Sequence, residues 1–446
     1  MYTYLRIRLI DLFARLAKRK NFSLIIANIG WQTFDKFIRM GLGIFVSVWV
    51  TRYLGPERFG TLSYAIAFAG MFSSVAGLGL DGIVIRELSL DNRPKDLIMG
   101  STFLLKLAGG FLAFSLSVLF IFVFKSHDPT IVLFVIIISL GFFFNTFDVV
   151  DFWFQSQIKY KYIFYAKNLA FFIASILKIL LILIKAELIY FVFVATIEIV
   201  LGSVGSTIMY NLTGNKIRKW GKNLIITKEL ILESWPLIIA GFATFLYLKI
   251  DQIMLGTLLN NTEVGIYSAA IKFSEIWYFI PSAIYTSVFP VLAKYKKENE
   301  ELFFIKYKKV CSIMALISVI IAVIMTFLSN YLVNLLYGQK FIQAGPILSV
   351  HIWAGVFVFI GVAGSMWIML EGLQKFTLFA TSLGAVVNII LNFYLIPLYS
   401  GFGAAIATVI SYAIAGYFVF FFYEKTRKIF LIQTTSIFLP WRDIRN

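Results

Sequence analysis

The sequence predicts an all-α integral membrane protein of about twelve transmembrane helices, arranged as two six-helix lobes related by pseudo-two-fold symmetry. Three observations predict this fold. The 446 residues are 60% hydrophobic and only 14% charged, which is the composition of a polytopic membrane protein. The apolar residues gather in segments of membrane-spanning length. Short motifs of the first half recur in the second half at a spacing of about 200 residues.

Each apolar segment predicts a helix, because about 20 apolar residues span a hydrocarbon layer of ~30 Å. Irregular backbone would leave its polar groups unsatisfied there. The predicted spans are residues 23–53, 60–86, 97–124, 130–154, 162–184, 187–210, 231–258, 264–292, 309–337, 344–370, 376–397 and 402–423.

The remaining stretches are short and basic. Residues 1–22 predict a cytoplasmic interfacial amphipathic segment rather than a cleaved signal peptide, because leucines recur at helical spacing among six basic residues and no small-residue cleavage site follows. The spans then divide into an N-lobe at 23–210 and a C-lobe at 231–423, joined by a cytoplasmic linker at 211–230 and followed by a basic cytoplasmic tail at 424–446.

The net charge of +17 follows the alternation of the predicted spans. With a cytoplasmic N-terminus, about 28 of the 40 Lys and Arg lie inside and only about five outside, which predicts that both termini are cytoplasmic. The charge therefore encodes topology, and we expect no nucleic-acid partner. The outer connections are a handful of residues each, so the sequence offers no loop for the active site of a membrane-bound glycosyltransferase or polymerase. We expect no enzymatic activity.

Cysteine and histidine are nearly absent. The single Cys311 excludes an intrachain disulfide, and His127 and His351 lack the neighbouring ligands of a metal site. We therefore expect no metal and no cofactor, and a structural role for both histidines.

The first span carries a polar stripe. At ~1.5 Å per residue, Asp35 lies roughly 18 Å along the helix from Ser23, near the middle of the hydrocarbon layer. A charge there costs at least ~2.5 to 3.5 kcal/mol, so the stripe should face other helices or a wet cavity. The alternative is a purely structural pair between Asp35 and Arg39 at i, i+4. The stripe comprises Asn28, Gln32, Asp35 and Arg39, flanked by Trp31 and Lys36.

Other spans also carry deep polar groups. Their alternative role is mutual ion pairing between helices. The fourth span has Asn145, Asp148, Asp151 and Gln155 on one face, the seventh has Tyr247, Lys249 and Asp251, the eighth has Lys272 and Glu275, and Lys106, Lys178 and Glu198 stand as isolated charges.

An acidic ligand suits these cations, because Arg binds phosphate through a planar fork and Lys as a point charge. Buried carboxylates beside them have the properties needed for coupling to H⁺ or Na⁺. Aromatic rings can stack on sugars, although most aromatic residues in so apolar a chain must face lipid or core. The substrate-binding candidates are Lys36, Arg39, Lys106, Lys249, Gln32, Trp31 and Trp153, and the coupling candidates are Asp35, Asp148 and Asp251.

A glycine cluster, residues 77–82, superficially looks like a phosphate loop. It follows no strand and lacks the Lys-Ser/Thr pair of a nucleotide site. We expect these glycines to permit close helix packing or a bend at the cytoplasmic rim.

The two halves share motifs. Leu54-Gly55 of the first half recurs as Leu255-Gly256, and Trp153 recurs as Trp367. Because each half holds an even number of spans, the halves share one orientation, and such repeats place a substrate site between the lobes.

The motifs at 54–60, at 77–82 with Arg86-Glu87, and at 255–269 together resemble those of Wzx-type polysaccharide-biosynthesis flippases. These belong to the multidrug/oligosaccharidyl-lipid/polysaccharide (MOP) exporter superfamily. The resemblance implies a bacterial inner-membrane protein that moves an undecaprenyl-diphosphate-linked oligosaccharide, such as an O-antigen unit of lipopolysaccharide, to the periplasmic leaflet by alternating access. It also implies contacts with membrane lipids and with a polysaccharide polymerase and a chain-length regulator.

Three other functions compete with this one. A related exporter of small organic cations would use Asp35 and Asp148 to bind its drug. A lipid II flippase of the same superfamily would carry a peptidoglycan precursor, although twelve spans rather than fourteen weaken that assignment. A non-transporting assembly factor would hold glycan enzymes together.

Overall fold

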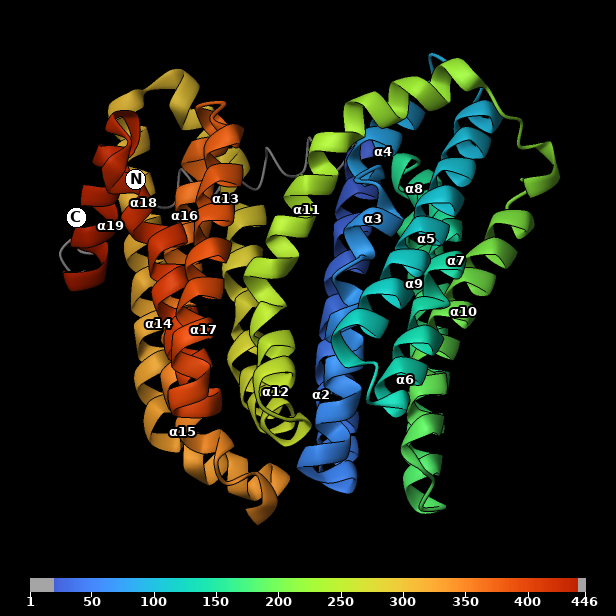
Figure 1. Cartoon of the computed structure of the whole chain (residues 1–446). Helices are drawn as coiled ribbons and strands as arrows, with labels where there is room; N and C mark the ends of the chain where they lie inside the picture. The colour runs from blue at the N-terminus through green and yellow to red at the C-terminus, as the bar shows by residue number, and fades with distance from the viewer. Residues whose placement is uncertain (1–19, 440–446) are drawn as a thin grey trace. The chain divides into compact units, whose positions relative to one another are not determined.

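The computed structural model describes residues 20–439, which contain helices and turns but no strand. Figure 1 shows the course of the chain. Of the predicted interfacial segment at 1–22, all but the last three residues lie outside the described part, as do residues 440–446 of the predicted tail.

Among the described residues, ten helices are long and apolar enough to cross a membrane. Two of them contain a kinked, non-helical residue: Gly55 in α2 (Lys20–Gly70) and Ser400 in α17 (Gln374–Ala413). Each kink falls in the gap that separates two predicted spans. The ten helices therefore comprise twelve segments, which confirms the predicted all-α membrane fold of about twelve spans.

The other spans match their predicted positions to within a few residues at most ends. Local signals explain several helix starts: Asn260 and Asn299 accept hydrogen bonds from the backbone N–H of Glu263 and Leu302, as N-caps do. The spans are α5 (Lys95–Lys125), α6 to α8 (Pro129–Ser139, Gly141–Phe144, Val149–Ser156), α9 (Tyr160–Leu183), α10 (Leu188–Leu212), α11 (Leu224–Leu258), α12 and α13 (Asn261–Glu275, Phe279–Glu298), α14 (Glu300–Tyr337), α15 and α16 (Ala344–His351, Ala354–Leu370), and α17 continued by η5 (Ile414–Phe418) and α18 (Val419–Phe422).

The predicted second span, 60–86, is shorter than expected. α2 ends at Gly70, and α3 (Ser73–Gly77) and α4 (Asp81–Leu90) follow. Between α3 and α4, Leu78 and Gly79 both adopt left-handed backbone, with φ of 53° and 62°. A Cβ on Gly79 would lie 2.6 Å from the Cβ of Leu237, so the turn also packs tightly. The glycine cluster is therefore a bend with close packing, as predicted.

The fourth span is interrupted at its polar stripe. A 3₁₀ turn, η1 (Asn145–Asp148), separates α7 from α8. Such a turn tightens the helix locally and often marks a functional hinge. Asp148 ends this turn and Asp151 lies in the first turn of α8, so the two carboxylates occupy differently wound backbone.

The chain forms two compact units. Unit 1 contains residues 72–120, 133–238 and the described residues up to Ser47; unit 2 contains residues 48–71, 121–132 and the described residues from 239 onward. Trp153 belongs to a buried apolar cluster of unit 1, and its repeat counterpart Trp367 to one of unit 2. The second repeated motif thus serves the core of each unit.

Helix α11 contributes to both units. Its first part, up to Ile238, belongs to unit 1 and the rest to unit 2. Pro236 lies inside the helix near this division. Proline removes one backbone hydrogen bond and crowds the preceding turn, so it weakens the helix there.

Part of the predicted tail is structured. Helix α19 (Arg427–Phe438) packs against α14, where Ser312 donates a hydrogen bond to Ser436 over 3.1 Å. Gln433 of α19 also donates to the carbonyl of Ile360 in α16.

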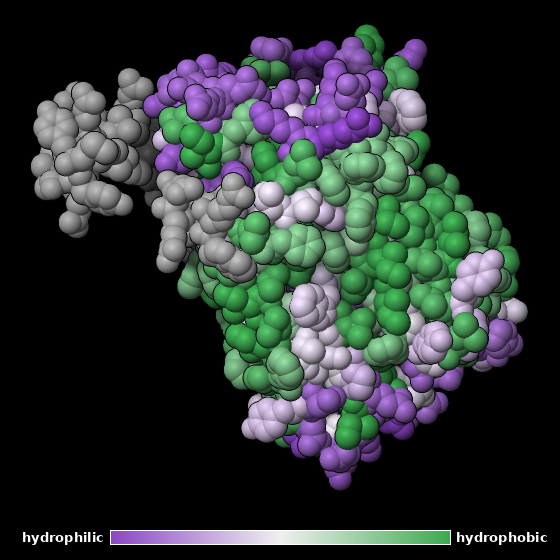
Figure 2. Space-filling model, turned by 90° about the vertical axis from the view of Figure 1, so that its left-hand side faces the viewer, coloured by the Kyte–Doolittle hydropathy of each residue, from purple (hydrophilic) through white to green (hydrophobic). Residues whose placement is uncertain are grey.

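The face in Figure 2 shows a broad apolar band between two hydrophilic ends. That distribution suits a protein surrounded by lipid.

Gly55 adopts φ 72° and ψ 175°, a conformation essentially reserved for glycine, and no atom lies within 4 Å of the position that a Cβ would take there. We predict that Gly55→Ala lowers the free energy of unfolding by about 1 to 3 kcal/mol through backbone strain alone. Gly41→Ala is the matched control in the same helix, since its surroundings are equally open and its backbone is helical. Thermal unfolding in detergent should show a lower midpoint for the first variant only; equal midpoints would contradict the strain.

Candidate functional site

Asp35 is the centre of a polar network in unit 1. Its carboxylate accepts hydrogen bonds from Arg39 Nε at 2.9 Å, Tyr160 Oη at 3.0 Å and Asn168 Nδ2 at 2.5 Å. The contact with Arg39 is the intrahelical pair that the sequence offers as a structural alternative. The other two donors come from α9, so Asp35 also ties α2 to α9. Asn28 strengthens the same junction by accepting a hydrogen bond from the Tyr160 backbone N–H.

The neighbours of Asp35 on α2 lie in different surroundings. Lys36 is exposed and Gln32 is half-buried. Trp31 packs against aromatic rings of α9, with its ring centroid 4.8 Å from that of Phe164 and 5.5 Å from that of Tyr165. Its ring therefore supports helix packing within unit 1.

A second network joins four charges of α5, η1, α8 and α9. Lys167 Nζ lies 2.9 Å from Asp148 Oδ1 and 3.0 Å from Asp151 Oδ2. Lys106 Nζ lies 3.7 Å from the other Asp148 oxygen, and only 4% of this side chain is exposed. Ser206 of α10 donates to Asp151 Oδ1 over 2.7 Å. Asp148 is thus shared by two lysines, and the nearer contact belongs to Lys167.

Trp153 is buried in the core of unit 1, where its ring lies 5.1 Å from that of Tyr210. The ammonium groups of Lys95 and Lys159 lie 5.5 and 5.6 Å from its ring. Trp153 also borders a polar pocket of about 470 Å³ at the ends of α4 and α8.

In unit 2, Lys249 and Glu275 form an ion pair. Lys249 Nζ lies 2.9 Å from both carboxylate oxygens of Glu275. The pair joins α11 to the end of α12. Lys272, which shares the eighth span with Glu275, lies over the ring of Phe59 at 4.7 Å.

Asp251 begins a buried network of uncharged polar side chains in unit 2. Only 3% of the residue is exposed, and Oδ2 accepts hydrogen bonds from Tyr267 and, over 3.0 Å, from Thr408. Through the Thr408 carbonyl, the network continues to Ser411, Asn388 and Asn392. Asp251 Oδ1 and Asn392 Oδ1 are both buried without a hydrogen-bond partner. The Asp251 oxygen can take up a proton or bind a cation, and the Asn392 oxygen can accept a hydrogen bond.

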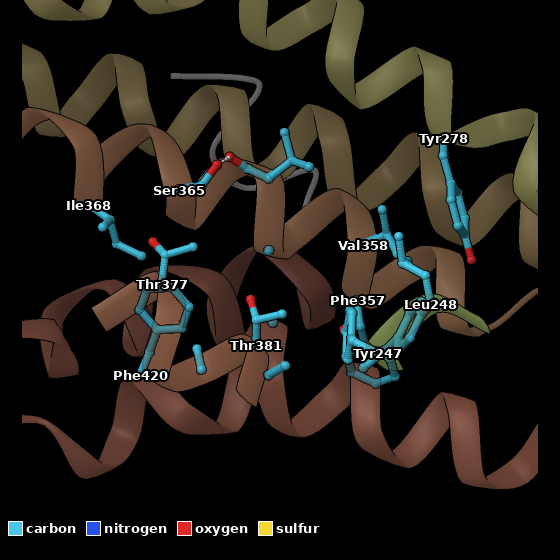
Figure 3. Close-up of a pocket in the computed structure, with 16 residues that line it drawn as sticks. Tyr247, Leu248, Tyr278, Phe357, Val358, Ser365, Ile368, Thr377, Thr381 and Phe420 are labelled. Atoms are coloured by element: carbon cyan, nitrogen blue, oxygen red, sulfur yellow. Dashed lines mark hydrogen bonds between the residues drawn. The ribbon is translucent and has the colours of Figure 1, made fainter. Parts of the chain in front are cut away.

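A pocket of about 250 Å³ lies in unit 2 between α11, α16 and α17. Figure 3 shows its aromatic residues Tyr247 and Phe357 and the hydroxyls of Ser365, Thr377 and Thr381. The Tyr247 ring stacks on that of Tyr412, with 4.4 Å between the ring centroids. None of the described residues that line this pocket is charged. It therefore suits an apolar group with a few hydroxyl contacts rather than a phosphate.

Two sequence expectations need correction. Lys106 is not isolated, because it contacts Asp148, and Lys178 and Glu198 pair with each other at 3.1 Å. Both corrections have one cause: an unpaired charge in hydrocarbon is costly, so opposite charges of neighbouring helices pair with each other.

Lys167 was not among the predicted site residues, although a lysine inside the apolar fifth span is a signal for it.

Together the networks pair the deep charges of each unit. Arg39, Lys106 and Lys167 contact carboxylates in unit 1, and Lys249 does so in unit 2. Among residues 20–439, no group of three His, Cys, Asp or Glu side chains could hold a metal ion. The arrangement offers exchangeable charge–charge contacts, which suit recognition of an ionic ligand.

Comparison with known families gives two matches. The model of the polysaccharide biosynthesis protein family matches residues 25–296, more than half of the chain. The model of the MatE family matches residues 236–394.

Similar sequences include a capsular polysaccharide biosynthesis protein of Staphylococcus aureus, which is 25% identical over 46% of this chain and 52% of its own length. A protein of Haloferax volcanii named as a probable low-salt glycan biosynthesis flippase is 25% identical over 40% of this chain and 38% of its own length. The chain thus aligns with about half or less of these two relatives.

Solved structures share the fold across nearly the whole chain. A lipid II flippase in an inward closed conformation has a TM-score of 0.67 at 18% identity, covering 92% of this chain and 91% of that one. An inward-facing multidrug resistance transporter of the MATE family has a TM-score of 0.69 at 15% identity, covering 93% and 99%.

We predict that Lys167→Met lowers the free energy of unfolding by about 3 kcal/mol or more, because two carboxylates lose their nearer lysine contact in a membrane interior. The double variant Lys167→Met/Asp151→Asn should recover part of this loss, since it removes one unpaired charge. Thermal unfolding of the purified protein measures both effects. A double variant no more stable than the single one would show that charge pairing does not govern this cluster.

Proposed function

This chain belongs to the polysaccharide biosynthesis protein family of the MOP exporter superfamily, and from that membership we propose that it moves a lipid-linked oligosaccharide across a membrane. The family match over residues 25–296 is the observation that carries the proposal. Specifically, we propose an undecaprenyl-diphosphate-linked repeat unit of O-antigen or another surface polysaccharide. In a bacterial inner membrane it would move from the cytoplasmic to the periplasmic leaflet.

The charge networks support a diphosphate-bearing substrate. A cation kept in the membrane without a partner is costly, and pairing with carboxylate lowers that cost before the substrate arrives. A diphosphate can then take over the contact that one of these cations, Lys106 or Arg39 in unit 1 or Lys249 in unit 2, makes with its carboxylate. Of these three cations, Lys106 has the longest carboxylate contact, 3.7 Å, and shares Asp148 with Lys167. Lys106 is therefore our first candidate for phosphate.

An exchange of ion-pair partners would couple substrate binding to the uptake of a proton or a cation. When phosphate takes Arg39, Asp35 loses its counter-charge, and when phosphate takes Lys106, Asp148 loses one of its two; the carboxylate is then stabilised by taking up a proton or a cation. Asp251 has a free buried oxygen for the same purpose in unit 2. The membrane potential adds to the drive, since outward movement of an anion is favoured by ~2.3 kcal/mol per charge per 100 mV when the inside is negative.

A cation exporter is the runner-up, favoured by the MatE match over residues 236–394. It would need carboxylates that are available to a drug, whereas Asp35 and Asp148 already contact Arg39, Lys106 and Lys167. A drug-susceptibility panel separates the two functions, because glycan export should not alter it. A lipid II flippase would instead make the gene essential for peptidoglycan synthesis.

We predict that cells lacking this protein accumulate the lipid-linked oligosaccharide on the cytoplasmic leaflet, as assigned by an impermeant probe. Wild-type protein should relieve the accumulation, and Lys106→Ala and Arg39→Ala should each reduce relief about tenfold or more, because each removes a charged phosphate contact. Lys178→Ala is the matched control, since Lys178 forms a deep ion pair outside the candidate set. A normal leaflet distribution in the deletion strain would reject the flippase.

We also predict that Asp251→Asn abolishes stimulation of transport by an imposed Na⁺ or H⁺ gradient in proteoliposomes, because an amide cannot exchange a proton or balance a cation. Basal movement driven by the membrane potential should remain. Glu198→Gln serves as the control, since Glu198 contacts Lys178 in unit 1. Gradient stimulation that survives in Asp251→Asn would remove Asp251 from the coupling mechanism.

A further inference from the structure

The polar pocket of about 470 Å³ in unit 1 has no part in the ion-pair networks described above. It lies where the ends of α4 and α8 pack against each other (Figure 1). The end of α4 and the start of α5 supply Ser89, Asp91 and Lys95, and the end of α8 supplies Ser156 and Gln157. Hydroxyl, carboxylate, ammonium and amide groups therefore line one cavity.

Two ammonium groups approach one indole ring at this pocket. Lys95 Nζ lies 5.5 Å from the ring of Trp153, and Lys159 Nζ lies 5.6 Å from it. Lys95 also donates a hydrogen bond to the side-chain oxygen of Asn215 over 2.5 Å. Within residues 20–439, neither lysine forms an ion pair with a carboxylate. Both cations therefore have neutral partners and can bind an anion without first giving up a carboxylate.

The backbone around the pocket is strained at two positions. Asp91 and Ile158 both line it and both adopt left-handed backbone, with φ of 51° and 55°. Only five non-glycine residues of the described chain have a positive φ, so two of the five meet at this pocket. For a β-branched residue such as isoleucine this conformation is an outlier. Strain of this kind gathers at functional sites, where the surrounding structure enforces it.

The internal repeat shows that the turn itself does not require isoleucine. Trp153 recurs as Trp367, so Ile158 corresponds to Gly372, which has a φ of 71°. Both turns are closed in the same way, by Lys159 N–H donating to the Phe154 carbonyl over 2.8 Å and by Leu373 N–H donating to the Ile368 carbonyl over 3.0 Å. Unit 2 forms the turn with glycine, which adopts this backbone without strain. In unit 1, an apolar side chain stands at the pocket instead.

This lining suits a phosphate ester that also carries hydroxyl groups. The two lysines bind phosphate as point charges. The carboxylate of Asp91 repels a bare phosphate but accepts hydrogen bonds from hydroxyl groups, and the amide of Gln157 both donates and accepts them. Ile158 adds apolar surface for the carbon face of a sugar ring. A sugar phosphate combines all of these features in one ligand.

We propose that this pocket captures the sugar-phosphate part of the lipid-linked substrate before transport, with phosphate on Lys95 and Lys159 and sugar hydroxyls on Asp91 and Gln157. The predicted topology puts the ends of α4 and α8 on the cytoplasmic side, where the proposed substrate is taken up. The inference rests on the proposed function for the identity of the substrate. Binding of a sugar phosphate to the pocket can be measured independently of that function.

The first test measures binding to the purified protein. Ser89→Cys in a Cys311→Ser background puts a reactive thiol in the pocket, because Ser89 is exposed and lines it. A soluble hexose 1-phosphate should slow labelling of this thiol by a maleimide reagent. Lys95→Gln and Lys159→Gln should each raise the half-protecting concentration about tenfold or more, since each removes a charged phosphate contact. Lys161→Gln is the matched control, because this ammonium lies over another ring. No protection, or equal protection in all three variants, overturns the site.

Two further probes identify the ligand class. Inorganic phosphate should protect the thiol only at concentrations about tenfold or more higher, because it makes no hydroxyl contacts with Asp91 and Gln157. Glycerol 3-phosphate, which resembles a phospholipid headgroup, should also protect less well than the hexose 1-phosphate. Equal protection by either probe overturns the assignment to a sugar phosphate and assigns the pocket to phospholipid headgroups or to anions in general.

A variant that relieves strain separates binding from folding. Ile158→Gly suits the left-handed turn, as Gly372 does in unit 2, so the thermal midpoint should not fall. Protection by the hexose 1-phosphate should nevertheless weaken, because the apolar side chain at the pocket is gone. Unchanged protection in a variant with an unchanged or higher midpoint overturns the part of Ile158 in the site.

The second test measures capture during transport. In proteoliposomes, Lys159→Gln should lower leaflet transfer about tenfold at subsaturating substrate, and saturating substrate should recover most of the loss, because capture precedes transfer. Lys161→Gln should leave transfer unchanged. An unchanged half-saturating concentration in Lys159→Gln overturns the capture role. Failure of the flippase function is distinguishable, because wild type would then transfer no oligosaccharide, whereas the hexose 1-phosphate would still protect the thiol at position 89.

Discussion

The cost of charge in hydrocarbon governs the interior of this protein. An unpaired cation deep in the membrane would cost several kcal/mol. In the structure, carboxylates of neighbouring helices form ion pairs with these cations. Asp35 ties α2 to α9, Lys167 ties α9 to η1 and α8, and Lys249 ties α11 to α12. The same contacts that hold the helices together are those that an anionic substrate would exchange. Under the proposed function, stability and substrate recognition would depend on the same side chains.

Backbone irregularities set the positions of these charges. Asp148 ends the 3₁₀ turn η1 and Asp151 lies in the first turn of α8; three residues apart, they share one face of the span and both reach Lys167. The positive φ at Gly55 redirects α2 after the Asp35 network. The apolar helices set how far each span reaches across the membrane, whereas Gly55 and the turn η1 set where the helix direction or winding changes.

The sequence predicted the number, order and approximate ends of the spans, because apolar length is a local property that hydropathy measures directly. It also predicted Asp35, Arg39 and Asp148 as deep polar groups. It did not predict that Glu275 pairs with Lys249, 26 residues away, while Lys272 lies over Phe59. Partner choice depends on how each helix is rotated about its axis, which tertiary packing decides. Tyr160 was missed for the same reason, whereas Lys167 had a signal in the sequence, its position inside an apolar span.

The division of α11 has a mechanical consequence. Because α11 is one continuous helix that belongs partly to each unit, it connects them through helical backbone rather than through a flexible loop. Pro236 is its softest point, because one hydrogen bond is missing there. Any bending that the proposed transport imposes on this helix should therefore concentrate at Pro236.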